Sequence, residues 1–257
     1  MIELDFFDAN CRLGVPMNGA WTCAPDIPDL LSEMDRVGVR RALVAAVNAA
    51  AAGAVYENAL LSEKFARHAQ SAVGRLFACW SILPEQCDEL PHGQAFFDCM
   101  AEHNVRAVEM LPKSHRWVPR RVVVGPLFDR LAEAGIPILM RVHDEAGGWE
   151  GVYDIVERFP ENRFIIASCG VWGCDRLIRP LLDGYKGVYF ETGENWTAGG
   201  IESLVSACGH DQILYGSNYP RDNHGQGMLN IRHARISDEA KVAIAGGNLT
   251  RLLNIKN

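Results

Sequence analysis

The chain alternates eight apolar segments of strand length with segments that have the apolar spacing of amphipathic helices. We predict strands over Ile2–Phe7, Arg41–Val47, Arg75–Ile82, Val105–Leu111, Ile136–Val142, Arg163–Ser168, Gly187–Thr192 and Gln212–Ser217. We predict helices over Asp29–Val37, Ala54–Gln70, Gly93–Glu102, Val123–Ala134, Trp149–Arg158, Asp175–Asp183, Ile201–Cys208, Ser237–Ala245 and Leu249–Leu253. Strand and helix alternating at this spacing is typical of βαβ units that build a parallel sheet.

Eight such units in roughly 250 residues is the usual size of one (β/α)8 TIM barrel, and we expect a single domain over residues 1–257. A doubly wound α/β sheet is the rival fold. That fold often has a glycine-rich turn after its first strand, but no G-x-G-x-x-G follows Phe7. In a barrel, the polar residues at the carboxyl ends of the strands share one mouth, where α/β barrels hold their active sites.

The composition limits the partners and the location that we expect. A net charge of −7 without a basic patch argues against nucleic acid and anionic membranes as partners, but allows an acidic small molecule. Eight cysteines without a CxxC pair indicate buried thiols in a reducing compartment. The first residues lack the pattern of a signal peptide, so we expect a cytoplasmic protein. Assembly into a homo-oligomer stays open.

Five segments of the chain, in order, resemble the motifs of a known family. Asp8–Gly14 resembles D-x-H-x-H-x-G, Gly135–Arg141 resembles G-x-P-x-x-x-H, and Phe159–Gly170 resembles F-P…I-I-x-A-H-x-G. Ile213–Pro220 resembles L-x-G-S-D-x-P, and Gly247–Leu253 resembles G-N-A-x-R-L-L. These motifs are those of the amidohydrolase-related (amidohydrolase 2) metal-dependent hydrolases. The resemblance covers nearly the whole chain and implies a TIM barrel that acts on a small molecule.

The residues that bind metal in that family are replaced in this chain. In the family, histidines on the first, fifth and sixth strands bind a divalent metal, and an aspartate on the eighth is ligand and proton acceptor. The five matching positions hold Asn10, Arg12, Arg141, Ser168 and Asn218. An amide takes up no proton, and two guanidinium groups would repel a cation between them by roughly several kcal/mol. We therefore expect neither a metal at this place nor a cofactor.

The arginines suggest the charge of the substrate. Arg12 and Arg141, at the ends of the first and fifth strands, suit bidentate binding of a carboxylate or phosphate, which predicts a small anionic substrate. Alternatively, each arginine pairs with an acid of the chain, for which Glu109, Asp144 and Glu191 are available. The predicted substrate-binding residues are the polar groups near the mouth: Arg12, Arg141, Asn10, Ser168, Glu191 and His224.

Three residues are predicted to be catalytic: His143, Glu109 and Asn218. His143 titrates near neutral pH and follows Arg141 by two residues, so it could act as general acid or base, or be a loop histidine bonded to the backbone. A carboxyl group such as Glu109 or Glu191 in an apolar barrel end has a raised pKa unless an arginine faces it. Either glutamate is then an acid or the counter-charge of Arg141. Asn218 replaces the family's aspartate and can only form hydrogen bonds.

Two functions remain open. The first is an amidohydrolase-like hydrolase that cleaves a C–O or C–N bond, or performs related lyase chemistry, on a small anionic organic substrate without a metal. In it the arginines bind the anion, and His143 or a carboxylate moves the proton. The second is a non-catalytic anion-binding protein or regulator on the same barrel, because a fold alone does not determine function.

Overall fold

The computed structural model describes residues 2–17, 19, 22–143, 145–170, 174–195 and 197–255. Eight parallel strands form one sheet in the order of the sequence. They are β1 Phe6–Leu13, β2 Val39–Ala46, β3 Leu76–Ile82, β4 Val105–Met110, β5 Ile138–Arg141, β6 Phe164–Ala167, β7 Val188–Glu191 and β8 Ile213–Leu214. The sheet closes on itself, because the amides of Ala9 and Arg12 donate to the carbonyl oxygens of Tyr215 and Tyr219, each at 2.9 Å.

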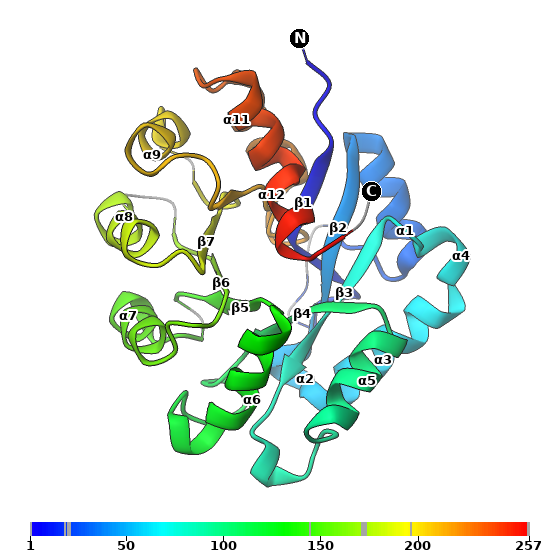
Figure 1. The fold of residues 1–257 in the computed structure, drawn as a ribbon. Helices are drawn as coiled ribbons and strands as arrows, with labels where there is room; N and C mark the ends of the chain where they lie inside the picture. Colours follow the sequence, from blue (N-terminus) through cyan, green and yellow to red (C-terminus); the bar gives the residue numbers. More distant parts are fainter. Residues whose placement is uncertain are drawn as a thin grey trace.

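Helices surround these strands, which confirms the predicted (β/α)8 TIM barrel (Figure 1). They are α1 Ile27–Val37, α2 Ala49–Ala52, α3 Ala54–Arg67, α4 Ala69–Ala72, α5 Gln94–Glu102, α6 Arg121–Ala134, α7 Gly148–Arg158, α8 Asp175–Gly184, α9 Gly200–Cys208, α10 His224–His233, α11 Asp238–Val242 and α12 Asn248–Leu252. A 3₁₀ turn spans Glu85–Cys87, and a π-helical turn spans Ala243–Gly247. Within the described ranges, no helix combines the length and the apolar character that crossing a membrane requires.

The first strand lies further along the chain than the apolar pattern predicts. The prediction was Ile2–Phe7, and β1 spans Phe6–Leu13. Every residue of β1 is buried, including the polar ones. The apolar run ends at Phe7, and from Asp8 to Leu13 polar and apolar residues alternate. In the structure the strand continues through this segment, where Asn10 and Arg12 have partners inside the barrel. The last strand, β8, is shorter than the predicted Gln212–Ser217.

The apolar spacing also predicts no helix over His224–His233, where the structure has α10. The segment has two glycines and few apolar residues, which hides its helical period. Its start is fixed by a cap, because the side chain of Asn223 accepts a hydrogen bond from the amide of Gln226 at 3.1 Å.

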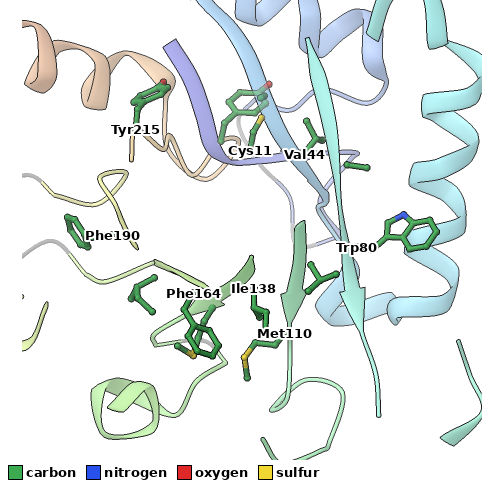
Figure 2. Packing of buried hydrophobic residues seen from close by; sticks show 14 of the residues in the cluster. Cys11, Val44, Trp80, Met110, Ile138, Phe164, Phe190 and Tyr215 are labelled. Carbon is green, nitrogen blue, oxygen red and sulfur yellow. The ribbon is translucent and has the colours of Figure 1, made fainter. Parts of the chain in front are cut away.

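Two apolar cores lie on the two faces of the sheet. On β5, Ile138 and Met140 belong to the core between strands and helices, whereas Leu139 belongs to the core inside the barrel. Figure 2 shows part of the outer core, with Ile138 among its labelled residues. From α12, Leu249 and Leu252 pack into the inner core. The closing helix therefore plugs one end of the barrel and leaves the carboxyl ends of the strands for the mouth.

Asn248 joins this closing helix to the barrel. It is fully buried, and its Nδ2 donates to the carbonyl oxygens of His210 and Ile213 at 2.6 and 2.8 Å. Asn248→Ala removes both hydrogen bonds and leaves the carbonyl oxygen of His210 with only the amide of Ile213, at 3.3 Å, so we expect it to lower the free energy of unfolding by about 2–4 kcal/mol. Urea denaturation measures the loss. Thr250→Ala, which removes one side-chain hydrogen bond at a partly exposed position, is the control and should cost less than about 1 kcal/mol. Equal losses would contradict this role of Asn248.

Candidate functional site

A buried ion pair joins opposite sides of the barrel. Arg12 of β1 and Glu109 of β4 form two contacts, Nη2 to Oε2 at 2.8 Å and Nη1 to Oε1 at 3.5 Å. Nη1 of Arg12 also donates to the carbonyl oxygen of Ala46 at 3.2 Å, and the hydroxyl of Ser81 donates to Oε1 of Glu109 at 2.9 Å. Both ionic side chains thus have several partners inside the barrel. Glu109 is therefore the bonded counter-charge of Arg12, and the charge of Arg141 also acts on it.

Arg141 adds a second positive charge to the same region. Burial raises the pKa of the Glu109 carboxyl, but the charges of Arg12 and Arg141 and the hydrogen bonds from Arg12 and Ser81 outweigh burial, so the pKa lies below its ordinary value. Nη2 of Arg141 also lies 3.9 Å from Oε1 of Glu145, a buried glutamate. Asp144, the other acid proposed as a partner, lies outside the described residues. Glu109 is consequently ionised at neutral pH.

The pKa of Glu191, on β7, is shifted in the opposite direction. Burial raises the pKa of its carboxyl from 4.5 to about 8, and the charges of Asp8 and Glu194 act in the same direction. Hydrogen bonds oppose the shift: the amide of Gly193 donates to Oε2 at 3.0 Å, and Nδ2 of Asn10 lies 3.4 Å from Oε1. A Cβ atom at Gly216 would lie 1.7 Å from Oε2, so glycine leaves the room that this carboxyl group occupies. Glu191 thus carries a proton at neutral pH inside the barrel.

A β-bulge turns Asn10 toward Glu191. The pairing of β1 with β2 shifts between Asp8 and Cys11, so the strand has an extra residue at this point. Ala9 belongs to the inner core and Cys11 to the outer core, and the side chain of Asn10 reaches Glu191 across the barrel end. The structure thus brings Asn10 to Glu191 and Arg12 to Glu109.

Two residues at the tips of β6 and β8 have left-handed backbones. Ser168 has φ 54° and Asn218 has φ 57°, which is costly for residues other than glycine, although asparagine tolerates it. Ser168 is buried, and its hydroxyl has no hydrogen-bond partner among the residues that the structure describes. Nδ2 of Asn218 donates to Asp222 at 2.8 Å. Strain of this kind gathers at functional sites, which suits a substrate position beside Ser168.

Glu194 lies at the site but was not predicted from the sequence. It is buried in the loop after β7, accepts a hydrogen bond from the amide of Gly170 at 2.7 Å, and lies 3.4 Å from Nδ2 of Asn218. A carboxylate thus stands next to the amide that replaces the family's aspartate. The loop sequence Gly193-Glu194-Asn195 has no motif that would have identified it, although it follows a strand with a buried glutamate.

The two histidines lie in different surroundings. His143 is exposed on the turn after β5, and one ring nitrogen, Nε2, lies 3.1 Å from the carbonyl oxygen of Cys169. His224 is fully buried at the start of α10, where its ring stacks on Tyr219 with centroids 4.7 Å apart. The sequence predicts His224 among the substrate-binding residues near the mouth, whereas the structure buries it with one ring nitrogen 3.2 Å from Oδ2 of Asp8 on β1.

The residues at the mouth do not fit the metal of the family. Two amides, a hydroxyl and two guanidinium groups stand at the five positions, and Glu109 already neutralises Arg12. Among the described residues, the group of three histidine, cysteine or carboxylate ligands that lies close enough to share an ion is elsewhere. Among the described residues, the five family positions therefore offer no ligand set that suits a divalent metal.

A separate cavity of about 610 Å³ lies at the opposite end of the strands. Residues at the starts of β3 and β4 line it, among them Leu76, Phe77 and Arg106. None of the site residues named above lines this cavity. It is therefore distinct from the mouth.

Comparison with known proteins agrees with the fold and the motifs. The family model described as Amidohydrolase matches residues 16–255. The match begins after β1, the strand on which Asn10 and Arg12 depart from the family pattern. No curated protein matches the chain.

Solved structures of decarboxylases have the same fold. A 2,6-dihydroxybenzoate decarboxylase with bound 2,6-dihydroxybenzoate has a TM-score of 0.78 at 13% identity, over 99% of this chain and 100% of that one. A dihydroxybenzoic acid decarboxylase from Polaromonas sp. JS666, with manganese and the inhibitor 2-nitroresorcinol, has a TM-score of 0.77 at 14% identity, over 99% and 98%. The 5-carboxyvanillate decarboxylase from Sphingomonas paucimobilis has a TM-score of 0.70 at 13% identity, over 99% and 100%.

Removing one member of the Arg12–Glu109 pair should destabilise the fold strongly. Either Arg12→Met or Glu109→Gln leaves a buried charge without its partner, so each should lower the free energy of unfolding by about 3–5 kcal/mol. The double variant removes both charges and should lose clearly less than the two single losses together. Urea denaturation at neutral pH of the four proteins provides this double-mutant cycle. Additive losses would show that the pair does not act as a unit.

The raised pKa of Glu191 makes stability depend on pH. A carboxyl group whose pKa is higher in the folded chain stabilises the fold fully below its unfolded pKa of 4.5, and this contribution is lost as the pH rises toward about 8. The loss is at most about 5 kcal/mol, at roughly 1.4 kcal/mol per pKa unit. Glu191→Gln should remove this slope between pH 5 and 9, as measured by urea denaturation. Glu157→Gln, at an exposed position, should keep it. An unchanged slope in Glu191→Gln would refute the assignment.

Proposed function

Because this chain belongs to the Amidohydrolase family, we propose that it is an enzyme that cleaves a small, carboxylate-bearing organic molecule by proton transfer at the mouth of its barrel. The reaction needs no divalent metal at the position that the family uses. Arg141 and Arg12 attract and orient the anion, and Glu191 exchanges the proton. The proposal names a substrate class, not one compound.

One observation carries this proposal: two buried carboxyl groups at the same barrel end have pKa values moved in opposite directions. The pKa of Glu109 is lowered by two arginines, and that of Glu191 is raised to about 8 by burial. Environments that separate two carboxyl groups in this way assign an acid and an ionised partner in many enzymes. Glu191 is then the proton donor at neutral pH, and Glu109 keeps the charge of Arg12 balanced.

The charge of the mouth supports an anionic substrate. Arg12 and Arg141 bring two positive charges; Glu109 is bonded to Arg12, and Glu145 lies 3.9 Å from Arg141. Glu191 is protonated at neutral pH, so it adds no negative charge to repel an anion. The decarboxylases of similar fold carry names of hydroxylated aromatic acids, which supports a cyclic or aromatic carboxylate as the class to test first.

Two reactions use these groups. In a decarboxylation, Glu191 donates its proton to the ring carbon from which carbon dioxide leaves, and the arginines hold the anion. In a hydrolysis, water attacks an ester or amide carbonyl, Glu191 protonates the leaving oxygen or nitrogen, and His143 or Glu194 takes the proton of the water. Neither route calls on Asn218 to accept a proton, and its amide is left to position Glu194 or the substrate.

A non-catalytic anion-binding protein is the second candidate. It is favoured by Asn218, because the residue at the tip of β8 can hydrogen-bond but cannot accept the proton that the family's aspartate accepts. The two candidates share the anion pocket and differ in turnover. The test therefore has to measure binding and reaction separately.

The compounds to test are hydroxybenzoates, lactones and small amides that carry a carboxylate. We expect some of them to bind and raise the melting temperature of the protein, and at least one of them to be turned over. Glu191→Gln should lower kcat by roughly 10²- to 10⁴-fold with little change in binding, because it removes the proton donor. Arg141→Met should weaken binding by about tenfold or more. In the wild type, kcat should fall as the pH rises above about 8, where Glu191 loses its proton.

The outcomes separate the candidates. Binding without turnover of any compound supports the binding protein. Full activity of Glu191→Gln contradicts the role of Glu191, and full activity of His143→Ala contradicts the role of His143 in hydrolysis. Unchanged binding in both Arg12→Met and Arg141→Met contradicts the anion pocket. A tightly bound metal whose ligands come from the mouth contradicts the proposal that the reaction needs no metal there.

A further inference from the structure

A second cluster of reactive side chains lies outside the barrel mouth. One carboxylate oxygen of Asp8, the sulfur of Cys11 and one ring nitrogen of His224 all lie within 4.8 Å of one another, and all three residues are buried. Asp8 and Cys11 come from β1, and His224 begins α10. Cys11 belongs to the core between strands and helices, where Figure 2 labels it together with Val44 and Tyr215. The cluster is thus separated from the mouth by the wall of the barrel.

His224 lacks hydrogen bonds that its burial would require. It has no exposed surface, and neither Nδ1 nor Nε2 has a hydrogen-bond partner of acceptable geometry among the described residues. Nδ1 does lie 3.2 Å from Oδ2 of Asp8, which is close enough for an ion pair. Buried polar atoms without a partner are rare and call for an explanation such as an ion. Tyr219 stacks on the ring at an interplanar angle of 16° and holds it in this orientation.

We propose that Asp8, Cys11 and His224 bind one zinc ion. Carboxylate oxygen, thiolate sulfur and imidazole nitrogen are the three donor types that zinc prefers in proteins. The thiolate, the carboxylate and the dication together have no net charge, so their burial costs far less than burial of the separate ions.

The three ligand atoms would have to move slightly closer together to bind zinc. Zinc has ligands at about 2.0–2.3 Å, which places neighbouring ligand atoms roughly 3.5 Å apart in a tetrahedron. The ligand atoms all lie within 4.8 Å of one another, so binding needs a contraction of roughly 1 Å, for which the side chain of Cys11 would turn toward Asp8 and the stacked ring of His224. Three ligands from the chain leave the fourth position for water.

The surroundings of Asp8 support its role as a ligand. Its Oδ1 accepts hydrogen bonds from the amides of Asn10 and Ser217 at 3.0 and 2.9 Å, and its Oδ2 accepts one from the hydroxyl of Ser217. Ligating carboxylates are held by such outer hydrogen bonds, which fix their orientation. Oδ2 faces His224 and keeps electron pairs for an ion.

Binding requires the thiol of Cys11 to lose its proton. Burial raises the pKa of that thiol well above its ordinary value, and the charge of Asp8 adds to the shift. Without a metal, Cys11 is therefore a neutral thiol. On binding, a sulfur–zinc bond replaces the sulfur–hydrogen bond, and the proton is released to solvent.

The ion would link β1 to α10, and its ligand Asp8 is hydrogen-bonded to Ser217 in the segment between β8 and α10. Asn218 lies in that segment, so zinc bound behind the barrel wall would stabilise the mouth without contact with the substrate. This inference does not depend on the proposed reaction. It adds a metal where the sequence motifs suggest none, because its ligands are not those of the family pattern.

Cobalt(II) and zinc(II), added to the full-length protein after removal of bound metal, test the site. We expect one equivalent of cobalt with the intense near-ultraviolet absorption of a cobalt–thiolate bond. Zinc should displace it and raise the melting temperature. Cys11→Ala should abolish the thiolate band, and Cys174→Ser, a change of a buried thiol elsewhere in the same core, should keep it. X-ray absorption of zinc in the wild type should show one sulfur ligand at about 2.3 Å, a measurement that needs no variant to fold.

Three results would overturn the site. They are a wild type that binds no cobalt or zinc above background, a thiolate band that survives in Cys11→Ala, and bound zinc without a sulfur ligand. In the last case the metal lies at another site.

Discussion

The bidentate pair of Arg12 and Glu109 sets the charges on which the rest of the mouth depends. Arg12 cannot lose its proton, so inside the barrel it requires a carboxylate, which Glu109 supplies at 2.8 Å. Ser81 donates a further hydrogen bond to Glu109, and Arg12 donates one to the carbonyl oxygen of Ala46. The charges of both arginines lower the pKa of Glu109. For Glu191 burial is the largest effect, and it raises the pKa to about 8. One ion pair thereby separates two glutamates of the same barrel into an ionised group and a protonated one.

Much of the fold could be predicted from the sequence, because βαβ units leave a regular pattern of apolar segments. The errors occurred where tertiary contacts outweigh that pattern. Polar residues of β1 are buried by partners on β4 and β7, and α10 depends on a cap and on packing more than on its own helical period. The rule that an arginine decides the pKa of a buried glutamate held for both Glu109 and Glu191. The role of Glu194 could not be predicted from the sequence, because its contact with Asn218 depends on the conformation of two loops.

Loss of metal ligands at the mouth and the ligand-like cluster behind it are two separate features of β1. The β-bulge between Asp8 and Cys11 divides them: Asn10 and Arg12 reach partners inside the barrel, whereas Cys11 enters the outer core beside His224. Under the proposed function, the family barrel is kept and protein carboxyl groups move the proton at the mouth. An ion in the outer cluster would support the structure and take no part in the reaction.

The protonation of Glu191 is the central claim, and carbon-13 NMR of glutamate side-chain carboxyl groups measures it most directly. Comparison of the wild type with Glu191→Gln identifies the signal, which is then followed from pH 4 to pH 10. The account predicts a change of this signal centred near pH 8, while the Glu109 signal has already moved at acidic pH. A Glu191 signal that titrates near its ordinary value of 4.5 would contradict the account, because the barrel would then hold no proton donor at neutral pH.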